Sequence, residues 1–139
     1  MHRHWEHFEH GADIGVRGFG STQGAAFEQA ALALTAVVAE PASVRALDRV
    51  DFDCEAPDAE LLLVHWLNAV ITQMALRRML FASFQVRIHG HRLKAHALGE
   101  AVSSSRHGPA VEVKGATVTA LRVAHLPGDG WVAQTVVDV

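Results

Sequence analysis

A strict alternation of apolar and acidic residues at positions 50–55 limits the possible folds of this chain more than any other feature. The letters there are VDFDCE, and a period of two is expected of a strand with one buried face and one wet face. The segment from Asp58 to Met79 follows, behind Pro57, and its period is different. Apolar residues recur there four positions apart, as on the buried stripe of a helix: Leu62, Trp66, Val70 and Met74. A half-buried strand followed by a long core helix is therefore predicted.

A second helix is predicted from Thr22 to Val38, with Ser21 as its N-cap and Pro41 just beyond its end. Alternating or β-branched stretches predict further strands, at residues 84–88, 92–98, 111–113, 117–124 and 131–139. Residues 99–109 are rich in Ser and Gly and predict a mobile loop. Because strands and helices are segregated, the expected class is α+β, a two-layer fold of mainly antiparallel β-sheet with two packed α-helices.

Length and composition favour one globular domain spanning residues 1–139. Half of the residues are hydrophobic and 19% are charged, which excludes a mainly disordered chain. No apolar run is long enough to span a membrane, the N-terminus lacks a secretory pattern, and the lone Cys54 allows no internal disulfide. We therefore expect a cytoplasmic protein without a membrane partner. The net charge of −3 argues against direct nucleic-acid binding by the chain as a whole.

Five motifs resemble the archease family, and they occur in the family's order along essentially the whole chain. They are HGADIGV at 10–16, FEQAALAL at 27–34, LLVHWLN at 62–68, the pair GE at 99–100 with RHG at 106–108 and VEVK at 111–114, and the ending VDV at 137–139. The chain departs from the family at Gly11, where Thr is usual, and at Val139, where Ile is usual. The 99–109 segment also lacks the family's more acidic character.

The resemblance implies an accessory protein and not an enzyme. Its partner would be a GTP-dependent RNA ligase of the RtcB type, whose guanylylation and multiple turnover it promotes in tRNA splicing or RNA repair. RNA would be met only through the ligase, and a tRNA methyltransferase is a further candidate partner. The resemblance also implies a divalent metal site, described as calcium, with Mg²⁺ or Mn²⁺ as alternatives, at Asp13, Asp138 and Val139.

The residues themselves are compatible with that site. Asp138 and the final carboxylate on Val139 lie one residue apart, and with Asp13 they would form an oxygen-rich cluster suited to Ca²⁺ or Mg²⁺ and unsuited to zinc. Asp138 ends a strand face that is otherwise largely apolar, where an unpaired carboxylate would be costly. The alternative interpretation, without a metal site, is that Asp13 caps a turn and that Asp138 is a solvated chain end.

Two further residues are candidates for contact with partner or nucleotide. Lys114 could meet a phosphate or a carboxylate on the ligase, although a strand lysine commonly guards a solvated edge. His107 could touch the nucleotide or the ligase, although a solvated loop histidine is commoner.

Three alternatives remain open. One is a stand-alone metal-dependent hydrolase with Asp13, Asp138 and Glu112 as ligands. Another is a chaperone-like module for tRNA-modifying enzymes. The third is zinc binding by the N-terminal histidines at positions 2, 4, 7 and 10, whose spacing matches no established zinc pattern.

Overall fold

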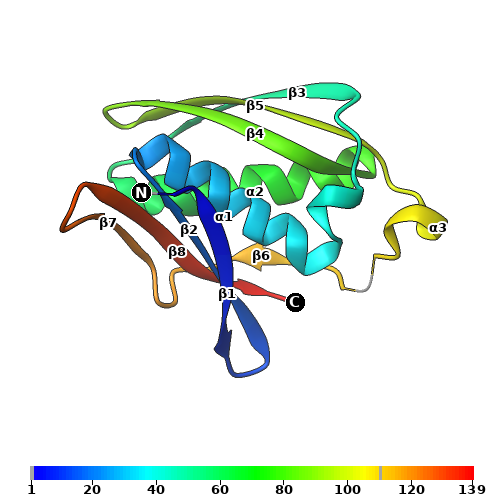
Figure 1. Ribbon diagram of the computed structural model, residues 1–139, viewed down its shortest axis with the longest axis horizontal. Helices are drawn as coiled ribbons and strands as arrows, with labels where there is room; N and C mark the ends of the chain where they lie inside the picture. The colour runs from blue at the N-terminus through cyan, green and yellow to red at the C-terminus, as the bar shows by residue number, and fades with distance from the viewer. Residues whose placement is uncertain (1, 110) are drawn as a thin grey trace.

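The computed structural model describes residues 2–109 and 111–139, and in it two antiparallel sheets enclose two long helices (Figure 1). Sheet A contains β1 (His4–His10), β2 (Asp13–Gly20), β8 (Gly130–Asp138) and β6 (Gly115–Ala116) in that order, and β7 (Arg122–Leu126) also pairs with β8. Sheet B has the order β3 (Asp48–Glu55), β5 (Arg92–Ala101) and β4 (Met79–His89). The α+β class with antiparallel strands and two packed long helices is confirmed. The sequence did not predict that the strands divide into two sheets, one on each side of the helices.

The helices form where their apolar stripes predict them. Helix α1 (Gln23–Val38) begins behind Thr22, whose side chain accepts a hydrogen bond from the amide of Ala25, so Thr22 and not Ser21 is the N-cap. Helix α2 (Ala59–Arg77) begins behind Asp58, which caps the amide of Leu61. It ends at Arg78, in the left-handed conformation. By length and composition α2 could cross a membrane, but five of its large apolar side chains lie in the protein core: Leu62, Leu63, Trp66, Leu67 and Val70.

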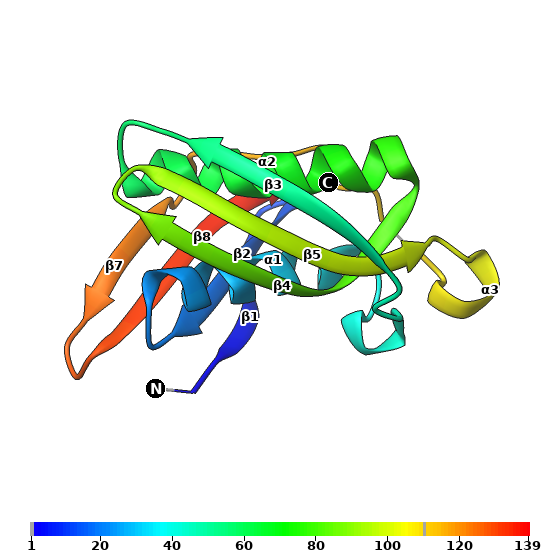
Figure 2. The same cartoon turned by 90° about the horizontal axis from the view of Figure 1, so that it is seen from above.

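Helix α1 lies against both sheets, and two glycines permit this. A Cβ on Gly18 of β2 would lie 2.3 Å from the carbonyl oxygen of Ala26, and one on Gly24 would lie 2.7 Å from the carbonyl oxygen of Val86 on β4. Because no side chain intervenes, the helix backbone approaches both sheets closely. In Figure 2, α1 and α2 can be followed beneath the three strands of sheet B.

Three parts of the chain differ from the sequence prediction. Residues 99–101 belong to β5 and 104–107 form the short helix α3 (Ser104–His107), so this stretch is not simply a mobile loop. The strand predicted at 111–113 is wrong, because pairing begins only at Gly115, and 117–124 is a strand only from Arg122. A short 3-10 helix, η1 (Pro41–Ser43), and the β1–β2 hairpin were not predicted.

Candidate functional site

The start of β2 and the end of β8 meet at one edge of sheet A. Their antiparallel register pairs Ile14 with Val137, so the next step along the strands places Asp13 opposite Asp138. The amide of Val139 donates to Oδ1 of Asp13 at 3.4 Å. The fold thus brings the early aspartate against the last two residues, 126 positions later in sequence.

Strands β1 and β6 extend this arrangement into a row across the sheet. His10 is paired with Asp13 on one side, and Gly115 is paired with Asp138 on the other. We call these four residues (His10, Asp13, Asp138 and Gly115) the carboxylate row. Lys114 adjoins it, because its amide donates to the carbonyl oxygen of Asp138 at 2.8 Å. Four of the five residues proposed for binding or contact therefore lie together: Asp13, Asp138, Val139 and Lys114.

Helix α2 fixes the β6 end of the row. The side chain of Asn68 accepts a hydrogen bond from the amide of Ala116 at 2.9 Å. This contact explains why an asparagine ends the helical motif LLVHWLN: it ties the short β6 strand, and with it Lys114, to the core. Sequence reasoning recorded the motif but missed this role for Asn68.

The chemistry of the row is that of exposed oxygen donors. Asp138 is exposed, while Asp13 and Val139 are partly buried. The expectation that Asp138 would suffer desolvation on an apolar face is therefore wrong. Exposed or partly exposed carboxylates are ligands for a hard cation that keeps water among its ligands.

Side chains alone do not complete a metal site here. Within residues 2–109 and 111–139, no group of three or more His, Cys, Asp or Glu side chains is arranged to hold a metal ion. A cation at the row would therefore need main-chain oxygens or water beside Asp13 and Asp138. Oxygen donors of this kind fit Ca²⁺ or Mg²⁺ and not zinc.

Two of the four N-terminal histidines have other partners. The ring of His4 stacks on Phe19 with centroids 4.4 Å apart, and Nε2 of His7 hydrogen-bonds the carbonyl oxygen of Ala33 at 2.7 Å. Residues 4 and 7 thus serve the hairpin and its contact with α1. The described residues give the zinc alternative no support.

His107 belongs to a separate, buried cluster centred on Glu100. Glu100 is 4% exposed and His107 is 8% exposed, so the solvated loop histidine considered above is wrong. The amide of Ser103 donates to Nδ1 of His107 at 2.9 Å. Because a main-chain amide can only donate, Nδ1 is the acceptor, and the Nε2–H group donates to Glu100 at 3.1 Å.

Two arginines complete this cluster. Arg106 binds Glu100 through both Nη atoms, at 2.8 and 2.6 Å, and Arg45 donates its amide and its Nε. The Arg106 guanidinium, with help from these amide and imidazole donors, holds the pKa of the Glu100 carboxyl well below its usual range. Arg106 also reaches the carbonyl oxygen of Ser43 in η1. The cluster therefore anchors residues 100–107, which precede Lys114 in the chain.

Sequence reasoning named His107 but missed Glu100 and Arg45. The signal for Glu100 was its place in a family motif; for Arg45 no local signal exists, because its partner lies 55 residues away. His107 is buried, so it is not available for direct contact with a partner in this structure.

Comparison with known proteins identifies the family of this chain. Residues 5–139 match the family described as the archease protein family (MTH1598/TM1083). The chain belongs to the archease family. It is 40% identical to the protein archease of Thermococcus gammatolerans, with 99% of each chain covered. It is 36% identical to that of Pyrococcus furiosus, with the same coverage.

Solved structures show the same archease fold. The solution structure of protein 1598 of Methanobacterium thermoautotrophicum has a TM-score of 0.84 at 26% identity and covers 97% of this chain and 98% of its own. A Thermotoga maritima protein, described as "an archease, possible chaperone", has a TM-score of 0.57 at 17% identity, with 95% and 94% covered. This second likeness concerns the fold alone.

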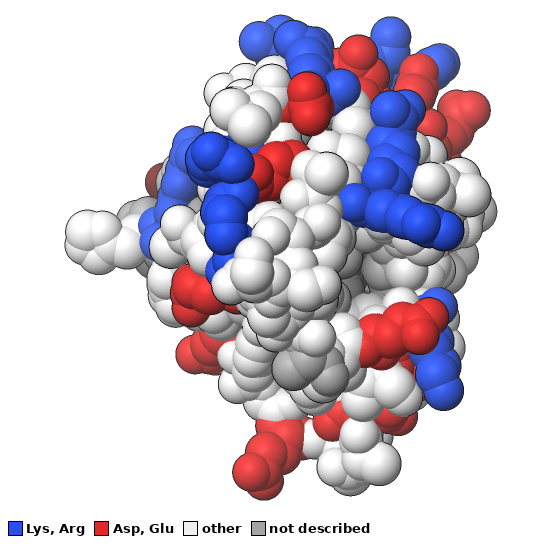
Figure 3. All heavy atoms as spheres, turned by 90° about the vertical axis from the view of Figure 1, so that its right-hand side faces the viewer, with Lys and Arg blue, Asp and Glu red and all other residues white. Residues whose placement is uncertain are grey.

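Charge is unevenly distributed over this archease. Figure 3 views the right-hand side of Figure 1, and most of its basic side chains lie there in the upper and middle parts, with acidic side chains among them. Acidic side chains predominate in the lowest part, toward the end of the molecule where the β1–β2 hairpin lies in Figure 1.

Proposed function

We propose that this chain is an accessory protein that activates a GTP-dependent RNA ligase of the RtcB type, promoting its guanylylation and multiple turnover. The observation that carries the proposal is the contact between Asp13 and the amide of Val139, which gathers the family's implied site residues at one sheet edge. The setting would be tRNA splicing or RNA repair in the cytoplasm.

The carboxylate row would hold a divalent cation, Ca²⁺ first and Mg²⁺ or Mn²⁺ as alternatives. Asp13 and Asp138 supply side-chain oxygens, and the proposal counts the carboxylate of Val139 as a third ligand. When bound, the cation supplies positive charge where triphosphate charge must be neutralised. Lys114, held beside the row through Asp138, would offer three donors to a phosphate or to a ligase carboxylate.

Multiple-turnover ligation with the partner ligase at limiting concentration tests this proposal. We expect Asp13→Asn and Asp138→Asn each to lower the stimulation at least about tenfold, the scale of a lost oxygen ligand. Asp48→Asn, which removes an exposed carboxylate from the start of β3, is the matched control and should stimulate normally. Full stimulation by both row variants, with their fold intact by circular dichroism, would refute the mechanism.

An independent hydrolase remains a separable alternative. It would use Asp13, Asp138 and Glu112, and the purified chain with RNA and Mn²⁺ or Mg²⁺, without ligase, should then cleave. Because Glu112 is exposed on an irregular segment, the geometry favours activation over this alternative.

A chaperone-like role toward tRNA-modifying enzymes is the second candidate, and the words "possible chaperone" for the T. maritima protein favour it. A native pull-down decides between partners: recovery of a tRNA methyltransferase without ligase supports the chaperone role, and recovery of ligase supports activation.

A further inference from the structure

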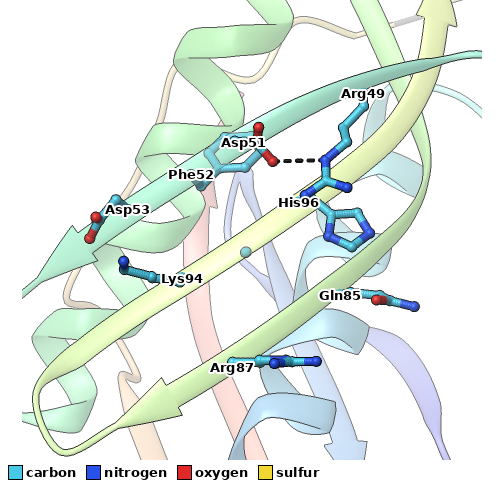
Figure 4. A pocket seen from close by; sticks show the side chains of 9 residues that line it. Arg49, Asp51, Phe52, Asp53, Gln85, Arg87, Lys94 and His96 are labelled. Atoms are coloured by element: carbon cyan, nitrogen blue, oxygen red, sulfur yellow. Dashed lines mark hydrogen bonds and ion pairs between the residues drawn. The ribbon is translucent and has the colours of Figure 1, made fainter.

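The outer face of sheet B carries a shallow groove that the proposed function does not use. The groove is about 630 Å³ in volume, and Figure 4 shows its side chains on all three strands. Strand β3 contributes Arg49, Asp51 and Asp53, β5 contributes Lys94 and His96, and β4 contributes Gln85 and Arg87. Its two carboxylates lie on β3, and β4 contains no carboxylate at all.

Both groove carboxylates already have partners. Arg49 donates to Asp51 at 2.9 Å. Arg92 binds Asp53 through two nitrogens, at 3.0 and 2.8 Å, and thereby lowers the pKa of that carboxyl. Lys94 faces Asp53 across the β3–β5 register, but the carboxylate is occupied by Arg92. The β3 side of the groove is therefore close to neutral.

The β4 side is not neutral. Arg87 and Lys94 are directly opposite each other on β4 and β5, and their side chains point in different directions in Figure 4. Across the part of the chain that the structure describes, neither one has a carboxylate within 4.0 Å. Gln85 on β4 and His96 on β5 are also paired, two residues along the strands from Arg87 and Lys94. They add hydrogen-bonding groups beside the two cations.

The chemistry of this face favours a polyanion over an apolar protein surface. The groove's β4 and β5 side chains are cationic or hydrogen-bonding, whereas the centre of a protein interface is enriched in aromatic and other apolar groups. Nucleic-acid interfaces are polar and positively charged. Arg87 and Lys94 lie opposite each other on neighbouring strands, which are about 4.8 Å apart, so both can contact the same stretch of a phosphate backbone.

We infer that the outer face of sheet B binds the phosphodiester backbone of a single-stranded nucleic acid, with Arg87 and Lys94 as its principal contacts. A second hollow, lined by Thr22, Gln23 and His89, also includes Arg87 in its lining. The inference does not depend on the carboxylate row, which lies on the other sheet.

Fluorescence anisotropy of a labelled single-stranded RNA, titrated with the isolated protein at low salt, tests the inference. We expect Arg87→Glu/Lys94→Glu to weaken binding at least about tenfold, since two phosphate contacts become repulsive. Removing two phosphate contacts should also flatten the dependence of log K on log salt by about 1.4, at about 0.7 per phosphate of a single strand. A purely structural change would not alter that slope.

Two control variants guard the interpretation. The charge-preserving pair Arg87→Lys/Lys94→Arg should bind as the parent does. The pair Arg77→Glu/Arg122→Glu makes the same charge change on α2 and β7 and should bind nearly as the parent does. Unchanged binding by Arg87→Glu/Lys94→Glu, or an equal loss in Arg77→Glu/Arg122→Glu, would overturn the inference.

Competition between the labelled RNA and unlabelled polyanions identifies which class of polyanion the groove binds. Unlabelled RNA should displace the probe, and single-stranded DNA of the same sequence that competes equally supports recognition of the backbone. A preference for RNA supports the inference and identifies RNA as the ligand. If polyglutamate of equal charge competes as well as RNA, the face fits an acidic protein and the inference fails. Neither result bears on ligase stimulation by the row variants, so the two proposals fail separately.

Discussion

The indole N–H of Trp66 donates a hydrogen bond to the main-chain carbonyl of Phe27 at 3.1 Å, joining α2 to α1 in the middle of the core. Trp66 is fully buried, and its ring meets Phe52 and Phe84 edge-on, with centroids 5.1 and 5.8 Å apart. One side chain thus connects both helices with two strands of sheet B.

Trp66→Phe should therefore destabilise the protein by about 2–3 kcal/mol, through lost ring volume and one lost buried hydrogen bond. Urea unfolding followed by far-UV circular dichroism measures this. Trp131→Phe, a partly buried site, is the control and should cost less. Equal losses at the two positions would show that Trp66 has no special part in joining the helices.

Gly18→Ala should cost about 3 kcal/mol, the upper range for inserting a carbon into a packed core. The new Cβ would meet backbone atoms of Ala26 and Ala30, both at 2.3 Å, and backbone cannot rotate away. Gly90→Ala provides the contrast: it has no neighbour within 4 Å but a φ of +60°, so only backbone strain of about 1 kcal/mol is expected. The ranking of their thermal midpoints checks this, and a reversed ranking would contradict the close approach of α1.

Acid should weaken the Glu100 cluster. The pKa of Glu100 in the folded protein is held below the 4.5 of an unperturbed glutamate, mainly by Arg106. The ionised carboxylate therefore stabilises the fold fully above pH 4.5, and this stabilisation is lost as the pH falls toward the folded-state pKa. Glu100→Gln should unfold more easily at pH 7 and show a shallower loss of stability on acidification. Parallel curves for the parent and the variant from pH 7 to acid would refute the assignment.

Calcium should stabilise the parent protein if the carboxylate row binds it. At about one hundred times the dissociation constant, a cation that binds only the folded state adds about 2.7 kcal/mol. Differential scanning fluorimetry should show a rise in the unfolding midpoint for the parent and little or none for Asp13→Asn. A chain extended beyond Val139, which displaces its carboxylate, should respond less than the parent. An undiminished response in both variants would place the cation elsewhere.

Sequence patterns predicted β3 and α2 well, because both elements have one wet side and one buried side. The β1–β2 hairpin was missed for the opposite reason. Gly15 lies under the ring of Phe8, and Gly18 lies under α1, so glycine stands where an alternating apolar residue would have marked the strand. Because close packing requires glycine at these positions, β2 lacks the alternation of apolar and polar residues that predicts a strand.

The segment 99–109 was misjudged because its composition is that of a loop. Its order comes from ion pairs with Arg45 and Arg106 around Glu100, and the Arg45 partnership is invisible in a local window. The carboxylate row could be predicted only from the family resemblance. Nothing in the local sequence says that residue 13 will lie beside residue 139.

The placement of both helices between the sheets has a consequence for assembly. Each sheet has one face that points away from the helices. A ligand bound to the outer face of sheet B and a partner bound at the edge of sheet A therefore need not compete for space. Such a molecule can serve as a spacer, with a nucleic-acid strand on one side and an enzyme on the other. The thickness of the helical layer would then set how far apart the two are held.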